Sequence, residues 1–205
     1  MEIVKYYLLS VLLLFSVGLL SQSQEDLMSA FKKSYDFERS GDYSSAIGEL
    51  KKVYNSDSYE VNLRLGWLKY LGGLFTESIP YYEQCISLKP LSIEARLGIV
   101  YPAGAMGNWS HVEKTYIDIL EIDQENSIAL YRLGLIYYGR EDYKEAAKYF
   151  DRILNQYPFD YDSLIMSAWT YLKMGEMRKA KVLFNKVMLY SPNDKSALEG
   201  LELIK

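Results

Sequence analysis

Histidine and cysteine are almost absent from this chain, which contains one of each among its 205 residues. A zinc site needs several such ligands, and a catalytic triad needs a histidine beside a nucleophile and an acid. His111 lies at the expected start of a helix, where a surface or capping role fits better than catalysis. Cys85 has no partner for an internal disulfide, and its helical register predicts a small buried side chain.

A strong excess of charge of one sign is also lacking, because the net charge is -4 and acidic and basic residues are interspersed. Nucleic-acid binding needs a basic patch, so nucleic acid is a poor candidate partner. No glycine-rich phosphate loop follows a strand, since the sequence predicts no strands. Carboxylate pairs such as Asp118 and Glu121 have the three-residue spacing of an ordinary solvated helix face. We therefore expect no catalytic site, no metal ion or other cofactor, and no small-molecule substrate.

What the chain does contain is a period of 34 residues, which runs from about Leu27 to the C-terminus. Three registers repeat together: one rich in small residues, one aromatic, and one that mostly carries proline. Their members are Gly66, Val100, Gly134 and Ala168; Tyr82, Tyr116, Phe150 and Phe184; and Pro90, Gln124, Pro158 and Pro192. A unit of this length cannot bury its own apolar face, so neighbouring units are expected to stack into a continuous core.

Periodicity inside one unit predicts two helices joined by a tight turn. Between residues 127 and 160, apolar side chains recur at spacings of three and four on either side of a break at residues 139–142. The equivalent turns elsewhere carry glycine, which suits the left-handed conformation of a helix C-cap. These glycines are Gly41, Gly73, Gly107 and Gly175, and the small residues expected where the second helix crosses the first are Ala46, Ala146 and Ala180.

These features resemble the tetratricopeptide repeat, whose motif places small, aromatic and proline residues at fixed positions of a helical hairpin. The best-matching unit carries Leu130, Leu133, Gly134, Tyr137, Ala146, Phe150 and Pro158. The resemblance implies an all-α, right-handed solenoid occupying residues 24–205 as one domain. We expect repeats at 27–58, 59–92, 93–126, 127–160 and 161–194, followed by a capping helix at 195–205 that turns Leu198, Leu201 and Ile204 inward.

The third repeat departs most from the motif, because its first helix contains Gly98, Pro102 and Gly104. Proline lacks the amide that would bond to the carbonyl four residues earlier. A kink or a short irregular stretch is therefore expected there. Two interpretations stay open: drift in a tolerant repeat, or a bend that changes the curvature of the groove.

The N-terminus reads as a separate segment. Lys5 precedes an apolar run at residues 6–20, and Ser21 and Ser23 then supply small residues two apart. This pattern predicts a signal peptide at residues 1–23, cleaved after Ser23, and hence a periplasmic or secreted protein. The run is shorter than the ~20 residues that a spanning helix prefers, so a retained membrane anchor at residues 6–20 is the alternative.

The stripe of the first helices that core packing does not use is unusually aromatic. The resemblance places this stripe along a concave groove, where a protein or peptide partner would lie. The candidate groove residues are Phe31, Tyr35, Arg64, Trp67, Tyr70, Tyr101, Tyr131, Arg132, Tyr138 and Trp169. The asparagines that some relatives use to clamp a C-terminal carboxylate are missing, although Arg64 and Arg132 have the two-pronged geometry that binds carboxylates.

The sequence therefore favours a non-enzymatic exported scaffold that binds a peptide segment or a partner helix. Two alternatives remain. One is a structural subunit that associates with copies of itself as a homo-oligomer, and the other is a membrane-tethered accessory of an envelope assembly, in which the N-terminal segment is retained.

Overall fold

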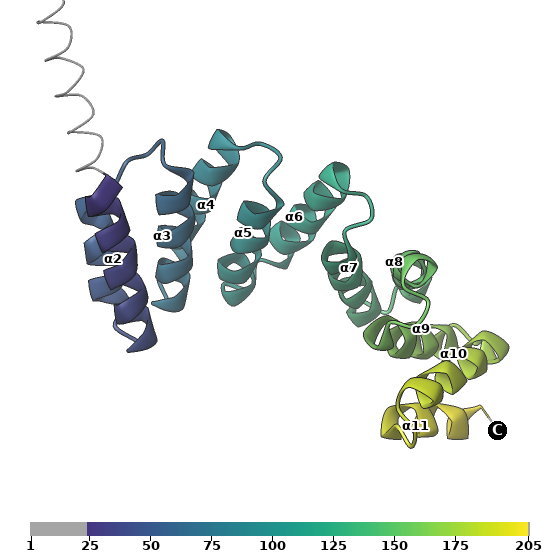
Figure 1. Ribbon diagram of the computed structural model, residues 1–205. Helices are drawn as coiled ribbons and strands as arrows, with labels where there is room; N and C mark the ends of the chain where they lie inside the picture. The colour runs from purple at the N-terminus through teal and green to yellow at the C-terminus, as the bar shows by residue number, and fades with distance from the viewer. Residues whose placement is uncertain (1–23, 205) are drawn as a thin grey trace, which may run out of the picture. The chain divides into compact units, whose positions relative to one another are not determined.

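The computed structural model describes residues 24–204, and every regular element within that range is an α-helix (Figure 1). The predicted signal peptide at 1–23 lies outside the described residues. The first helix covers residues 24–39 and is followed by α2 Tyr43–Lys52, α3 Tyr59–Leu71, α4 Phe75–Leu88, α5 Ile93–Ala105, α6 Trp109–Ile122, α7 Ser127–Gly139, α8 Tyr143–Gln156, α9 Tyr161–Lys173, α10 Met177–Tyr190 and α11 Lys195–Leu203. The predicted all-α fold class is confirmed.

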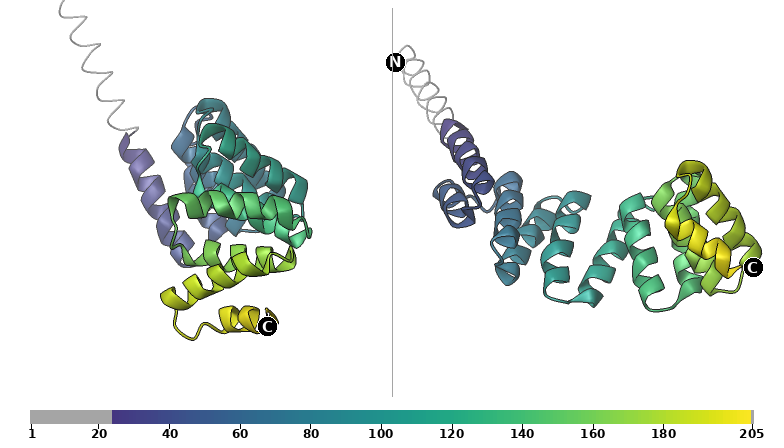
Figure 2. Two further views of the ribbon diagram at one scale, coloured as in Figure 1. Left: turned by 90° about the vertical axis from the view of Figure 1, so that its right-hand side faces the viewer. Right: turned by 90° about the horizontal axis from the view of Figure 1, so that it is seen from below.

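The chain divides into two compact units, of which unit 1 ends at Gly107 and unit 2 begins at Asn108. The boundary falls inside the predicted third repeat at 93–126, so α5 belongs to unit 1 and α6 to unit 2. In unit 1, α3 packs against α2, α4 and α5, and α4 also packs against α5. In unit 2, each helix packs against its neighbours in sequence, and α9 also packs against α7 and α11. Figure 2 shows α10 and α11 side by side. This stacking covers the apolar faces that a single hairpin leaves open.

A capping residue precedes α11 and the first helix of each hairpin from the second onward, and these residues also keep the 34-residue spacing. The side chain of each accepts a hydrogen bond from the backbone N–H three residues later, which contributes about 1 kcal/mol at a helix N-terminus. These residues are Ser58, Ser92, Asn126, Asp160 and Asp194.

The turns between paired helices confirm the predicted glycines and correct one position. Gly41, Gly73, Gly107 and Gly175 all have φ between 71° and 78°, in the left-handed region. In the fourth hairpin this conformation falls on Glu141, with φ 62°, and the glycine of that segment, Gly139, is instead the last residue of α7. Glu141, a residue with a Cβ, therefore adopts a backbone conformation that favours glycine.

The aromatic register of the second helices packs into space left by glycine on the first helices. A Cβ added to Gly98 would lie 2.2 Å from the Tyr82 ring, and one added to Gly134 would lie 2.5 Å from the Phe150 ring. Ala46, Ala146 and Ala180 are fully buried, as expected where the helices cross. These positions must therefore be small, because large rings occupy the adjacent volume.

The departures in the third repeat do not break its helix. α5 is one uninterrupted helix through Pro102, so the expected irregular stretch is absent. Pro102 lies in the last turn, where its carbonyl still accepts the N–H of Met106 at 3.1 Å. Gly98 has a packing role, because the Tyr82 ring covers it.

The capping helix is present, but its inward face differs from the expected one. Leu201 and Ile204 pack against the core that contains Phe184. Leu198 is 41% exposed and Ala197 is buried in its place. The inward positions take small residues because α11 lies close to Phe184, whose ring would be 2.1 Å from a Cβ on Gly200.

Candidate interaction groove

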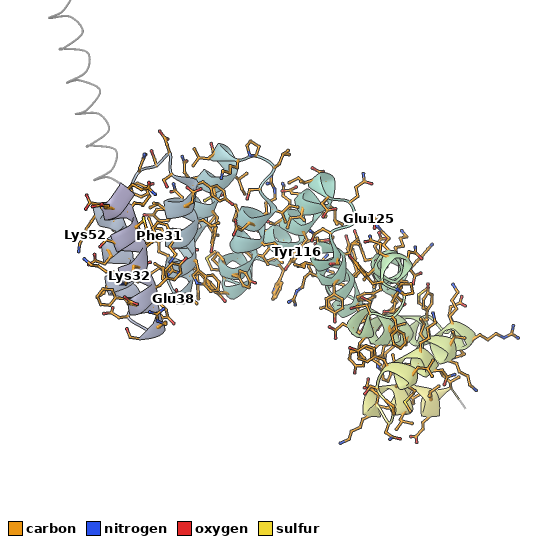
Figure 3. The ribbon with its side chains drawn as sticks, viewed as in Figure 1. Phe31, Lys32, Glu38, Lys52, Tyr116 and Glu125 are labelled. Atoms are coloured by element: carbon orange, nitrogen blue, oxygen red, sulfur yellow. The ribbon has the colours of Figure 1, made fainter. Side chains whose placement is uncertain are left out.

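A groove of about 890 Å³ lies on the face of unit 1 formed by the first helix, α3 and α5. Five of the ten predicted site residues line it: Phe31, Tyr35, Arg64, Trp67 and Tyr101. The other lining residues are Tyr59, Glu60, Leu63, Tyr82, Ile93, Glu94, Leu97 and Gly98. Phe31 and Glu38 extend from the first helix beside α3 (Figure 3). The groove thus joins residues from the first two hairpins and from α5, all within unit 1.

Aromatic rings form a connected cluster along this groove. The Trp67 ring centroid lies 5.9 Å from that of Tyr101 in an edge-on arrangement and 5.6 Å from that of Tyr70. Tyr70 lies 5.4 Å from Tyr101 and supports both rings without lining the groove. Tyr101 is 51% exposed and Tyr35 is 47% exposed. Rings held by one another in this way present apolar surface that loses little conformational freedom on binding.

Arg64 is a structural residue of this groove. Its side chain is only 7% exposed, its Nη2 lies 2.6 Å from Oε2 of Glu38, and its Nε donates to Oγ of Ser34 at 3.2 Å. The guanidinium lies 3.9 Å from the centroid of the Tyr35 ring. Because Glu38 already neutralises it, Arg64 is not a free cation for a partner's carboxylate, contrary to the expectation from sequence.

Glu38 links this ion pair to the aromatic cluster, since Nε1 of Trp67 donates to its Oε1 at 2.8 Å. Partial burial alone would raise the pKa of the Glu38 carboxyl, but hydrogen bonds from Arg64 and Trp67, together with the charge of Arg64, lower it below its usual value. The carboxylate therefore stays ionised and holds both side chains in place.

Two further carboxylates line the groove, and sequence reasoning missed them. Oε2 of Glu94 accepts a hydrogen bond from the Tyr59 hydroxyl at 3.1 Å. Oε1 of Glu60 lies 3.7 Å from Nζ of Lys89, with both side chains more than half exposed, a pairing that contributes little. Their 34-residue separation was the signal that could have revealed them. The exposed charge of the groove is thus mainly negative.

Unit 2 contains a smaller groove of about 450 Å³ at the first turns of α7 and α9. Tyr131 and Arg132 line it, together with Asp160 and Asp162 from the start of α9. Burial, and then the charge of Asp162, raise the pKa of Tyr131. Arg132 is exposed, so it remains the accessible arginine of the two predicted ones.

Tyr138 and Trp169 have packing contacts and do not line either groove. The Tyr138 ring lies edge-on to Tyr143 at 5.3 Å between centroids. Trp169 packs edge-on against Phe184 at 5.3 Å, and its Nε1 donates to Oγ of Ser196 in α11 at 2.8 Å. Both are half-buried. The groove stripe predicted from sequence therefore mixes groove residues with residues that join neighbouring helices.

Cys85 is fully buried, with its Sγ 3.4 Å from the carbonyl oxygen of Tyr59, as its register predicted. Burial raises the pKa of its thiol to about 12, so the reactive thiolate is disfavoured. Within residues 24–204 no group of acidic, histidine or cysteine side chains is placed to hold a metal ion. None of the helices in this range is long and apolar enough to cross a membrane.

The helical hairpins, their stacking and the apolar groove define a helical repeat protein. Three sequence models described as tetratricopeptide repeat match residues 59–90, 106–161 and 137–202. Residues 59–90 and 106–202 therefore consist of tetratricopeptide repeats.

Solved structures of similar fold include a tetratricopeptide repeat protein from Parabacteroides merdae, which is 24% identical with a TM-score of 0.73, over 87% of this chain and 72% of that one. A MamA protein is 19% identical with a TM-score of 0.67, over 81% of this chain and 92% of that one. A MamA RS-1 double mutant is 16% identical with a TM-score of 0.68, over 82% and 98% of the two chains. None of the curated proteins matches this chain in sequence.

Proposed function

We propose that this chain is an exported, non-enzymatic scaffold that binds a peptide segment or a helix of another protein through the unit 1 groove. Tetratricopeptide arrays present extended binding surfaces on their stacked helices, and this one carries an aromatic cluster there. The observation that carries the proposal is the half-exposed pair Tyr101 and Tyr35 on either side of Trp67. Exposed aromatic rings that gather in one groove, rather than lying singly on the surface, suit contact with another protein.

The binding test compares the unchanged protein with Trp67→Ala and Tyr101→Ala in an affinity capture from the native envelope fraction. Aromatic anchors of this kind contribute on the order of 2 kcal/mol each to binding. We expect both variants to lose the captured partner while circular dichroism still reports a helical protein. Tyr190→Ala is the matched control, because Tyr190 is 55% exposed but lines neither groove. Folded variants that keep every partner at undiminished affinity would contradict the proposal.

Export is the second part of the proposal and rests on the apolar run at residues 6–20 followed by Ser21 and Ser23. We expect the mature chain to begin at Gln24 and to reside in the periplasm or outside the cell. The measurement is the intact mass of the native protein after cell fractionation. A full-length chain in the membrane fraction would favour the anchored accessory, and a full-length chain free in the cytosol would contradict export altogether.

A further inference from the structure

We propose that the unit 1 groove selects a partner segment that carries lysine or arginine between apolar residues. The inference rests on the proposed function of this groove and specifies its partner. Two features of the described residues support it: the sign of the accessible charge in the groove, and the way tyrosine rings in unit 1 already contact cations.

The accessible charge of the groove is negative because its one lining arginine is already paired. Arg64 is 7% exposed and held by Glu38, so it offers no net positive charge to a ligand. Glu60 and Glu94 line the same groove from the first turns of α3 and α5, and both are exposed. Lys89 lies 3.7 Å from Glu60 at the edge of the groove, but that contact is solvated and weak. An acidic segment would meet repulsion here, whereas a basic segment would meet attraction.

The aromatic rings of unit 1 favour the same sign of charge. The face of an aromatic ring is negatively polarised, so cations bind over it. Arg64 lies 3.9 Å from the centroid of the Tyr35 ring, and Nζ of Lys89 lies 4.1 Å from that of the Tyr59 ring. Tyr101 is 51% exposed on the same groove and packs against Trp67 and Tyr70, without a cation of the chain over it among the described residues. A ligand ammonium or guanidinium over the Tyr101 ring would supply the missing contact.

The aromatic cluster also explains why the segment needs apolar residues. Leu63 and Leu97 line the groove beside Trp67, so much of its surface is hydrocarbon. Burial of apolar side chains provides affinity, while the two carboxylates provide selectivity for charge and a dependence on salt. A segment with charge alone would leave this surface in water.

The test is selection of binders from a displayed library of random short peptides on the purified protein. We expect the enriched peptides to carry lysine or arginine between apolar residues. Their affinity should fall on the order of tenfold for the Glu60→Gln/Glu94→Gln double variant, with a weaker dependence on salt. Glu83→Gln, an exposed carboxylate of α4 outside the groove, is the matched control and should leave affinity unchanged. Glu60→Lys/Glu94→Lys should shift the selection toward acidic peptides.

The outcomes separate this inference from the proposed function. Suppose that Trp67→Ala abolishes the binding of the enriched peptides, but that these peptides are acidic or neutral, or bind the double variant as tightly as the unchanged protein. That result would overturn the inference and leave the groove as a binding site. Peptides that bind independently of Trp67, or a selection without enriched binders, would overturn both. A concentration-dependent dimer in light scattering, abolished by Trp67→Ala, would identify a second copy as the occupant and also overturn the inference. Glu60→Gln alone, at a side chain 66% exposed, keeps the test valid should the double variant unfold.

Discussion

At the scale of single residues, Glu141 shows how one side chain carries backbone strain in an otherwise regular array. The equivalent position of the other four hairpins is glycine, and all five positions have positive φ. The left-handed conformation costs a residue with a Cβ roughly 1–2 kcal/mol, and glycine gives back roughly 0.5–1 kcal/mol through its freer unfolded chain. We therefore expect Glu141→Gly to raise the free energy of unfolding by about 0.5 kcal/mol.

Chemical denaturation monitored by circular dichroism measures this change. Gly175→Ala is the opposite control, because its φ of 78° strains any side chain, and it should lower the free energy of unfolding. A destabilised Glu141→Gly protein would mean that the glutamate side chain contributes more than its backbone strain costs.

At Ala146 the constraint is the volume available to the side chain. It is fully buried on α8, which packs against α7. Ala146→Leu adds carbon atoms where the helices cross and should cost about 1–3 kcal/mol of folding stability through overpacking. Lys148→Leu, two residues further on at an exposed position, should have little effect on the same thermal unfolding curve. Equal losses from the two substitutions would show that the crossing register is misplaced.

At the scale of elements, the helix caps connect one hairpin with the next. Asp194 caps α11 by accepting the N–H of Ala197 at 2.9 Å and also accepts the Tyr161 hydroxyl at 2.8 Å, so it joins α9 to α11. The pKa of the Asp194 carboxyl is lowered mainly by the hydrogen bond from the Ala197 backbone N–H, and to a smaller degree by the bond from the Tyr161 hydroxyl. Its contribution is thus present above the unfolded pKa and is lost as the pH falls through the folded one.

Asp194→Ala removes both bonds and should cost about 1–2 kcal/mol. The loss should be local first, so hydrogen exchange of the amides in α11 should accelerate more than that of amides in α8. Asp194→Asn keeps one acceptor oxygen for the N–H of Ala197 but loses the one that accepts the Tyr161 hydroxyl, so its loss at neutral pH should be smaller than that of Asp194→Ala. Uniform acceleration across unit 2 would instead place Asp194 in the global unfolding unit.

At the scale of the whole molecule, the period predicted the apolar packing that every repeat shares and did not predict contacts that are specific to one repeat. The apolar registers forecast the hairpins, the crossing at Ala146 and the burial of Cys85, because helix packing imposes the same volumes in every repeat. Arg64 and Leu198 were misjudged for the opposite reason. The ion pair of Arg64 depends on one glutamate of a neighbouring helix, and the exposure of Leu198 depends on how closely α11 approaches Phe184. Such contacts arise from three-dimensional neighbours that a register alone does not identify.

Tyrosine is abundant, with 20 residues among 205, so its titration concerns the whole molecule rather than one site. In residues 24–204, many of these phenols have a raised pKa. A hydrogen bond with Glu113 and partial burial raise that of Tyr137 to about 12, and burial is the main cause of the raised pKa values of Tyr82 and Tyr171. Others raised in the same direction are Tyr54, Tyr59, Tyr131, Tyr138, Tyr149 and Tyr161. Folding thus favours the protonated phenol in both units.

This shared shift predicts alkaline unfolding. An unfolded tyrosine loses its proton near pH ~10, while the folded phenols hold theirs to higher pH, so above that point the unfolded chain binds fewer protons than the folded one. The free energy of unfolding must then fall as the pH rises, because its slope follows the difference in bound protons. We expect stability to be unaffected by these groups at neutral pH and to decline between pH ~10 and the raised value of about 12 for Tyr137. Tyrosinate absorbance and far-ultraviolet circular dichroism, recorded on the same titration, should therefore change together in a steep step. A smooth absorbance titration centred near pH ~10, with helicity retained throughout, would show that the phenols ionise freely in the folded protein and would refute the prediction.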